Sequence, residues 1–267
     1  MPINIKIEEA TNYYEITKGE GSLYGREMEV KNWIHPAKHI TKIDGLEDST
    51  HYIHAYTDGS KNEAAVGSGF AIFSGSSLKT TLKYRLNESC TNYQAEQMAI
   101  LKALKYIQHL KDEEKTVLVY TDSKITVQSL QNQKRNTHLI DQIRNRVLDM
   151  EQHEWKVDFS WIKAHVGQRG NELADRLAKE ASRSKNIEEC YNRVLKSTVS
   201  SDLKEQCLKQ WQNEWERTTK GATTKSFFLI IVDRLKLRIN PTPNFTAIVT
   251  GHGNTQVQDI REPKVLL

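Results

Sequence analysis

The order of hydrophobic patterns along residues 52–182 limits the fold more than any other feature of the sequence. Three strand-like patterns come first, joined by short links rich in Gly, Ser, Lys and Asn, as hairpins require. Patterns typical of helices and of strands then alternate. This order predicts an α/β sheet of mixed direction. We expect strands near residues 52–57, 67–73, 80–86, 116–120 and 157–162, and helices near residues 92–110, 123–131, 139–152 and 171–182.

The rest of the chain differs in character and indicates three segments. The apolar residues of segment 1–50 show no sustained helical or strand-like spacing, and we interpret this segment as a connecting segment. Residues 51–185 hold the α/β domain, and residues 186–267 carry apolar and aromatic side chains at helical spacing. The last segment is therefore expected to be a mainly helical extension, interrupted at Gly221 and followed by a strand-like apolar stretch at 227–232. The acidic start and the abrupt end favour a fragment of a longer protein.

Composition excludes several classes of protein. The longest apolar run, Phe227–Val232, is far shorter than the ~20 residues that a membrane-spanning helix needs. The first residues contain no apolar stretch like that of a secretory signal. The three cysteines have no C-x-x-C spacing, and their odd number suits a reducing compartment. We expect an intracellular protein without a membrane partner, and nothing in the sequence indicates oligomerisation.

The charge distribution is compatible with nucleic-acid binding but does not demonstrate it. The net charge is +4, and residues 51–185 hold 20 Lys and Arg against 16 Asp and Glu. So many carboxylates beside the cations also fit an ordinary solvated surface. Lys134, Arg135, Arg144 and Arg146 offer a modest basic face, for which solvated surface is again the alternative.

Two aspartates follow expected strands. Asp58 comes after the first strand, in Tyr-Thr-Asp-Gly-Ser, and Asp122 after the fourth, in Tyr-Thr-Asp-Ser-Lys. Ligands of open α/β sheets gather beyond strand ends where the strand order switches, so both aspartates are placed to bind a cation. Either one alone can also be a helix N-cap or a turn residue.

Two further acids lie beside apolar helix faces. Glu96 is near the start of its helix, and Asp175 follows the inward-facing Ala174 of the last helix in the α/β domain. A carboxylate at the edge of an apolar face is costly unless it is paired or binds a metal, although surface placement remains the alternative for each. Four carboxylates on one sheet suit Mg²⁺, with Mn²⁺ as a second choice, and disfavour zinc. Two such ions, roughly 3.5–4 Å apart, can clamp the attacking and leaving oxygens of phosphoryl transfer.

Four segments of the chain resemble the motifs of type-1 ribonuclease H. These are Thr57–Ser60, Thr91–Glu96, Thr121–Ser123 and His165–Asp175. The last reads H-x-G-x-x-G-N-E-x-A-D and is the most specific of the four. The resemblance covers about half of the chain. This part of the sequence, including the segment Trp161–His165, is similar to the ribonuclease H domains of non-LTR retrotransposon polyproteins.

The resemblance implies a ribonuclease H-like, mixed five-stranded sheet with flanking helices. It also implies that Asp58, Glu96, Asp122 and Asp175 ligate metal and take part in catalysis, with Asp58 bridging two ions. His165 is implied to sit on a mobile loop that assists proton transfer or product release. The alternative for this histidine is an exposed loop residue without a function.

The resemblance implies weaker roles for two residues before the first helix. Thr91 would contact a DNA phosphate and Asn92 the RNA minor groove, although a Thr-Asn pair at this place is also an ordinary helix cap. Tyr93 and Gln94 stand where many members of the family carry Asn and Arg. A Tyr-x-Asp-Asp motif, typical of reverse transcriptases, is absent from the sequence.

These inferences favour a metal-dependent endoribonuclease that cuts the RNA strand of RNA–DNA hybrids and leaves 5′-phosphate and 3′-hydroxyl ends. Contacts to 2′-hydroxyls would select the RNA strand. One alternative is an inactive retrotransposon remnant that binds nucleic acid without cutting it. Another is a protein-interaction module built on residues 186–267. The presence of all four acids and the histidine favours the enzyme.

Overall fold

A computed structural model of the protein describes residues 52–62, 65–110, 114–132, 137–164 and 167–252. They fall into two compact units that divide between Val199 and Ser200. The first unit contains the sheet, and the second contains C-terminal helices. The connecting segment expected over residues 1–50 lies outside the described residues.

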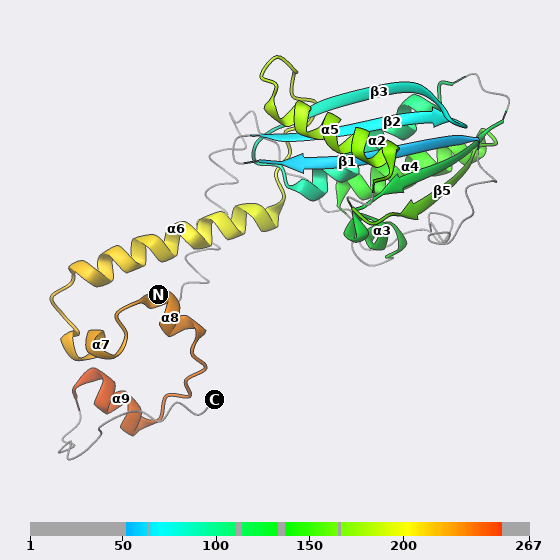
Figure 1. The fold of residues 1–267 in the computed structure, drawn as a ribbon. Helices are drawn as coiled ribbons and strands as arrows, with labels where there is room; N and C mark the ends of the chain where they lie inside the picture. Colours follow the sequence, from blue (N-terminus) through cyan, green and yellow to red (C-terminus); the bar gives the residue numbers. More distant parts are fainter. Residues whose placement is uncertain (1–51, 63–64, 111–113, 133–136, 165–166, 253–267) are drawn as a thin grey trace. The chain divides into compact units, whose positions relative to one another are not determined.

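The first unit is built on a five-stranded sheet of mixed direction (Figure 1). Its strands follow the order β3-β2-β1-β4-β5. The β1–β2 and β2–β3 pairs are antiparallel, and the β1–β4 and β4–β5 pairs are parallel. The predicted sheet is thereby confirmed. The strands are β1 (Ile53–Lys61), β2 (Val66–Ser74), β3 (Ser77–Leu86), β4 (Thr116–Thr121) and β5 (Lys156–Trp161).

Helices cover both faces of the sheet (Figure 1). The α2 and α4 helices lie on one face and α5 on the other. Gly69 of β2 lets α5 approach closely, because a Cβ atom there would lie 2.7 Å from the backbone nitrogen of Ala178. The four helices agree with the predicted ranges to within a few residues. They are α2 (Asn92–Ile107), α3 (Lys124–Gln131), α4 (His138–Gln152) and α5 (Arg169–Arg183).

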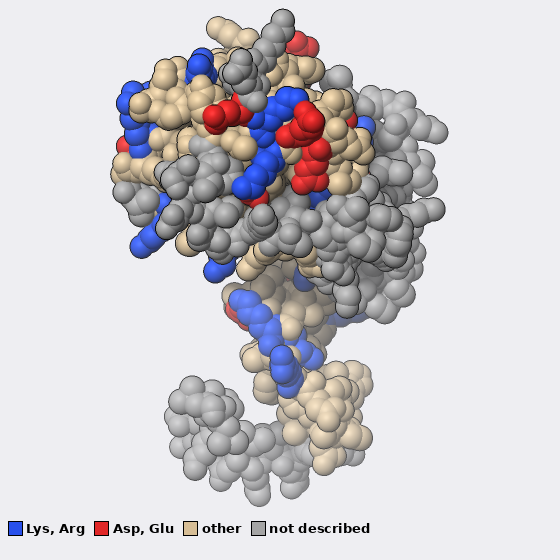
Figure 2. Space-filling view, turned by 90° about the vertical axis from the view of Figure 1, so that its right-hand side faces the viewer, with Lys and Arg blue, Asp and Glu red and all other residues tan. Residues whose placement is uncertain are grey.

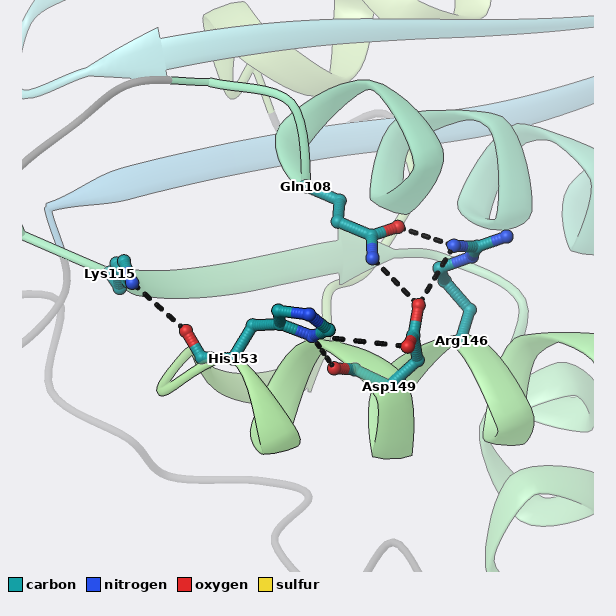
Figure 3. Close-up of polar contacts among 5 residues, drawn as sticks. All are labelled: Gln108, Lys115, Arg146, Asp149 and His153. Carbon is teal, nitrogen blue, oxygen red and sulfur yellow. Dashed lines mark hydrogen bonds and ion pairs between the residues drawn. The ribbon is translucent and has the colours of Figure 1, made fainter.

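A polar cluster ties the C-terminal end of α2 to α4 (Figure 3). Gln108 Nε2 donates to Asp149 Oδ2 at 2.6 Å, and Arg146 donates to the side chains of both Gln108 and Asp149. His153 lies next to Asp149 in the same cluster, and Lys115 Nζ donates to the His153 carbonyl at 3.0 Å. Because these side chains pair with one another, they fix the α2–α4 contact rather than present free charge.

The expectation of a basic face is wrong for Arg144 and Arg146. Arg144 is only 2% exposed, and its guanidinium donates to three backbone carbonyls at the end of α3. It therefore caps the α3 helix from inside the fold, where carbonyl groups lack helical partners. Arg146 belongs to the cluster with Gln108 described above. Lys134 and Arg135 lie outside the described residues.

The second unit is helical, as expected. It contains most of α6 (Lys196–Arg217) and all of α7 (Ala222–Phe227), α8 (Ile231–Lys236) and α9 (Pro243–Thr250). Among the described residues, no helix is long and apolar enough to span a membrane.

The strand expected at 227–232 is wrong, because Phe227 ends α7 and Ile231 begins α8. The backbone between these helices bonds to side chains of α6 instead of to a neighbouring strand. The Trp215 indole N–H donates to the Phe228 carbonyl at 2.9 Å, and the Ile231 N–H donates to the Gln212 side chain at 2.9 Å.

Candidate metal centre

Two aspartates lie side by side where the central parallel strands separate. The pairing of β1 with β4 ends at Thr57 and Thr121, and Asp58 and Asp122 are the next residues along the chain. Asp122 follows β4 as expected, whereas the expected end of the first strand at residue 57 is wrong, because β1 continues to Lys61 and pairs Asp58 with Gly69 of β2. The Thr57 hydroxyl donates to the Tyr120 carbonyl at 2.9 Å and ties the strands together just before they part. The strand order reverses at this point of the sheet, where α/β folds bind ligands.

The third carboxylate comes from α2. Glu96 is 4% exposed and Asp58 5% exposed, so both carboxylates are withdrawn from water. Asp58, Glu96 and Asp122 each offer a carboxylate oxygen, and these three oxygens lie within 4.8 Å of one another. Asn92 Nδ2 donates to Glu96 Oε1 at 3.4 Å.

Burial and mutual repulsion make two of these carboxylates, Asp58 and Glu96, hard to ionise. Burial, and then the charges of Asp122 and Asp175, raise the pKa of Asp58 to about 7, although the Gly59 N–H bonded to Asp58 Oδ1 at 2.7 Å acts in the opposite direction. Burial, followed by the charges of Asp58 and Asp122, raises the pKa of Glu96 well above its usual range. Such a cluster must hold protons or a cation at neutral pH.

The chemistry of the cluster fits a hard divalent cation. Glu96 Oε2 is buried and has no hydrogen-bond partner among the described residues. An unpaired buried carboxylate oxygen is costly, and a cation beside it removes that cost. Three carboxylates without sulfur or imidazole suit Mg²⁺ or Mn²⁺.

The backbone of Asp122 is fixed by Trp161, a role that its spacing in the sequence does not indicate. The Trp161 indole N–H donates to the Asp122 carbonyl at 3.0 Å, and the Lys124 backbone N–H donates to the same oxygen at 3.0 Å. The ammonium of Lys124 lies 5.7 Å from the centroid of the Trp161 ring. The end of β5 thus holds the turn that carries the Asp122 carboxylate.

Asp175 lies near the cluster without belonging to the group of three. It sits on α5, where its Oδ2 accepts from Lys179 Nζ at 2.7 Å, one helical turn further along. Its charge nevertheless contributes to the raised pKa of Asp58. Its role as a metal ligand stays a prediction.

The remaining expected site residues have different outcomes. Thr91 is the N-cap of α2: its hydroxyl accepts from the Gln94 N–H at 3.2 Å, and Gln94 Oε1 accepts from the Thr91 N–H at 2.8 Å. This reciprocal pair of bonds is a capping box, so Thr91 acts as a helix cap, which was the alternative to a nucleic-acid contact. Contacts of Thr91 and Asn92 with nucleic acid stay predictions, and His165 lies outside the described residues.

The surface charge is mixed on the face drawn in Figure 2, where basic and acidic side chains lie next to one another. A mixed face of this kind does not by itself indicate a nucleic-acid surface. The carboxylate cluster, and not the surface charge, is therefore the feature that indicates a function.

Comparisons with known proteins point to one family. The model of the RNase H family matches residues 50–183. The chain is 32% identical to proteins named Ribonuclease H from Francisella philomiragia and from Francisella tularensis subsp. novicida. These similarities extend over 149 and 139 residues, or 51% and 48% of this chain and 95% and 88% of the relatives. Among solved structures, the crystal structure of RNase H1 from Halobacterium salinarum is 23% identical with a TM-score of 0.39, covering 48% of this chain and 96% of that one.

Proposed function

The chain belongs to the RNase H family, and on this premise we propose that it is a metal-dependent endoribonuclease that hydrolyses the RNA strand of RNA–DNA hybrids. The observation that carries the proposal is the cluster of Asp58, Glu96 and Asp122, three carboxylates from three elements that converge within 4.8 Å. Two of them are buried and have raised pKa values, as expected of groups that a cation neutralises in the working protein.

The residues in and around the cluster would have different roles. Asp58, Glu96 and Asp122 would hold the cations, and Asp175 would add a fourth carboxylate from α5. Bound Mg²⁺ or Mn²⁺ would supply an activated water and charge stabilisation at the phosphate, which leaves 5′-phosphate and 3′-hydroxyl ends. Trp161 and the capping box of Thr91 would keep the turns and helix that carry these carboxylates in place. His165, in the segment between β5 and α5, would assist proton transfer or product release.

Recognition of the hybrid would use the start of α2. Asn92 is one turn before Glu96, and its amide already lies beside that carboxylate. A side chain at this place can reach the minor groove of a strand whose phosphate lies at the cluster, where 2′-hydroxyls distinguish RNA from DNA. Thr91 would contact a phosphate of the DNA strand. The similarity of Trp161–His165 to non-LTR retrotransposon polyproteins supports an origin in such an element, which we propose as well.

The test is cleavage of a labelled RNA–DNA hybrid by the full chain in Mg²⁺, with RNA–RNA and DNA–DNA duplexes of the same sequence as controls. We expect cuts in the RNA strand of the hybrid alone, with 5′-phosphate ends, and none in EDTA. A protein that binds the hybrid but leaves it intact in both Mg²⁺ and Mn²⁺ is instead the inactive remnant.

A further inference from the structure

Residues 189–194, here called the strap, follow α5 and lie beyond the part of the chain that the family model matches. The strap runs along the end of β3, the edge strand of the sheet, and Glu189 pairs with Arg85 in a parallel bridge. The Cys190 N–H donates to the Arg85 carbonyl at 2.9 Å, and the Asn87 N–H donates to the Tyr191 carbonyl at 2.9 Å. The strap thus covers backbone groups that an edge strand otherwise leaves to solvent.

Side chains add to this attachment. The Asn87 amide donates to Glu189 Oε2 at 3.0 Å, and the Arg85 guanidinium donates to the carbonyl of Ser184 at 2.9 Å. Cys190 packs against the hydrophobic core, and Val194 is buried. The strap is therefore part of the folded sheet unit and not a loose linker.

The strap also reaches the first turn of α2. Gln94 is 1% exposed, and its Nε2 donates to the Arg193 carbonyl at 2.9 Å. Its Oε1 simultaneously accepts from the Thr91 N–H in the capping box. The thiol of the buried Cys90 lies 3.7 Å from the same Arg193 carbonyl. The Gln94 side chain thus joins the cap of α2 to the strap.

This contact lies two residues before Glu96. The start of α2 also rests on β1, where a Cβ atom at Gly59 would lie 2.5 Å from the Glu96 backbone nitrogen. Because the start of α2 contacts both β1 and the strap, loosening the strap would allow α2 to move Glu96 relative to Asp58. A displacement of a fraction of an ångström matters, because ligands must be held close to the productive geometry.

We propose that the strap positions Glu96 in the carboxylate cluster, with Gln94 as the positioning residue. The metal-binding unit of this chain then extends beyond the segment that it shares with its family. The effect on cleavage rests on the proposed function, whereas the effect on cation binding does not.

The test compares two glutamines at opposite ends of α2 in the full chain. Gln94→Met removes the bond to the strap, and Gln108→Met removes a bond of the same type to Asp149 at the far end (Figure 3). We expect Gln94→Met to raise the Kd for Mn²⁺ about tenfold by titration calorimetry without nucleic acid, as losing an outer-shell partner does. Its kcat on the hybrid falls while KM changes little, because Gln94 does not touch substrate. Gln108→Met keeps the wild-type Kd and kcat, whatever stability it loses.

A second variant separates the strap from the helix cap. Gln94→Glu keeps the acceptor for the Thr91 N–H, as in the usual capping box, but cannot donate to Arg193. Its added negative charge favours cation binding, so a weakened Mn²⁺ affinity in this variant can only reflect altered geometry. A wild-type Kd in Gln94→Glu, or equal Kd values for Gln94→Met and Gln108→Met, overturns the proposal. If the wild-type chain does not cut hybrids, the proposed function fails, but the Mn²⁺ titrations still decide the role of the strap.

Discussion

Gly59 touches Glu96: a Cβ atom added to Gly59 would lie 2.5 Å from the backbone nitrogen of Glu96 and 2.8 Å from the Ala95 side chain. The residue directly after Asp58 is therefore a point of close contact between β1 and α2. Because the two carboxylates lie on either side of this contact, its closeness sets the distance between them. A residue with any side chain at position 59 must push α2 away from β1.

The first prediction follows from this contact. Gly59→Ala should lower the stability by about 1–3 kcal/mol, the usual cost of overpacking. It should also weaken Mn²⁺ binding, because Glu96 moves away from Asp58. Thermal unfolding with and without Mn²⁺ measures both effects in one experiment. The increase in melting temperature that Mn²⁺ causes should be smaller in the variant than in the wild type.

Gly75→Asn is the matched control. A Cβ atom at Gly75 meets nothing within 4 Å, and Asn tolerates the φ of +55° better than most residues. This variant should keep the full increase in melting temperature that Mn²⁺ causes in the wild type. If Gly59→Ala keeps that increase as well, the contact of Gly59 with Glu96 has no role in metal binding.

The sequence predicts most of the fold because the periodic patterns of the sheet unit are strong. Asp122 was identifiable from its place after a strand, and Glu96 from a helix start together with the family motif. Asp58 was identified although the first strand runs on to Lys61, because the polar residues after Thr57 conceal the continued pairing of β1 with β2. The strap was predicted as part of the helical extension because its apolar residues stand at helical spacing, and this prediction is wrong, since its backbone bonds to Arg85 and Asn87 instead of forming a helix. The strand predicted at 227–232 is also wrong. Its run of apolar residues is typical of a strand, but its backbone bonds to side chains of α6 and not to a neighbouring strand.

The second prediction concerns pH. The pKa of Asp58 is about 7 in the folded protein, compared with an ordinary value of 3.8, so the folded protein without metal binds this proton more tightly than the unfolded chain. Its stabilising contribution is complete below about pH 4 and is lost as the pH rises through about 7. A cation must displace the same proton. The apparent Kd for Mn²⁺ should therefore fall by up to about tenfold per pH unit between pH 6 and 7 and level off above.

Titration calorimetry at pH 6 in two buffers of different ionisation enthalpy measures the released protons directly. We expect a release of at least one proton per binding event at pH 6, from Asp58 and Glu96, and a smaller release as the pH rises. Asp58→Asn should reduce the pH dependence of the stability without metal and leave the part that Glu96 contributes. A Kd that is constant from pH 6 to 8 contradicts the assignment of the raised pKa to this cluster.

The third prediction concerns the end of the sheet unit. The sequence pattern places it at residue 185, whereas the strap contacts lead us to propose that it extends to Val199. A protein of residues 48–199 should fold and keep the Mn²⁺ affinity and hybrid cleavage of the full chain. A protein of residues 48–186 should be less stable and should bind Mn²⁺ as weakly as Gln94→Met does. Equal Mn²⁺ affinity of the two truncated proteins would mean that the pattern boundary is the correct one.

The last prediction separates an enzyme from a nucleic-acid-binding remnant. Asp58→Asn keeps the shape of the side chain but removes the charge at the centre of the cluster. We expect cleavage of the hybrid in Mg²⁺ to fall roughly 10³-fold, since each 1.36 kcal/mol of lost transition-state stabilisation is tenfold. Affinity for the hybrid in EDTA should hold or rise slightly, because one negative charge near a phosphate is gone. That affinity should weaken with added salt, as phosphate contacts do.

Asp233→Asn makes the same change of charge on exposed α8 and serves as the control. It should leave cleavage unchanged and measures any general effect of net charge on hybrid binding. Gel analysis of cleavage and fluorescence anisotropy on the same hybrid give the two readouts for each protein. Asp58 does not belong to the catalytic centre if Asp58→Asn cuts as fast as the wild type. If cleavage and binding fall together, Asp58 acts in holding the substrate or the fold. If Asp58→Asn loses cleavage but keeps its affinity for the hybrid, the charge of Asp58 acts in the chemical step, because binding of the hybrid in the ground state does not require it.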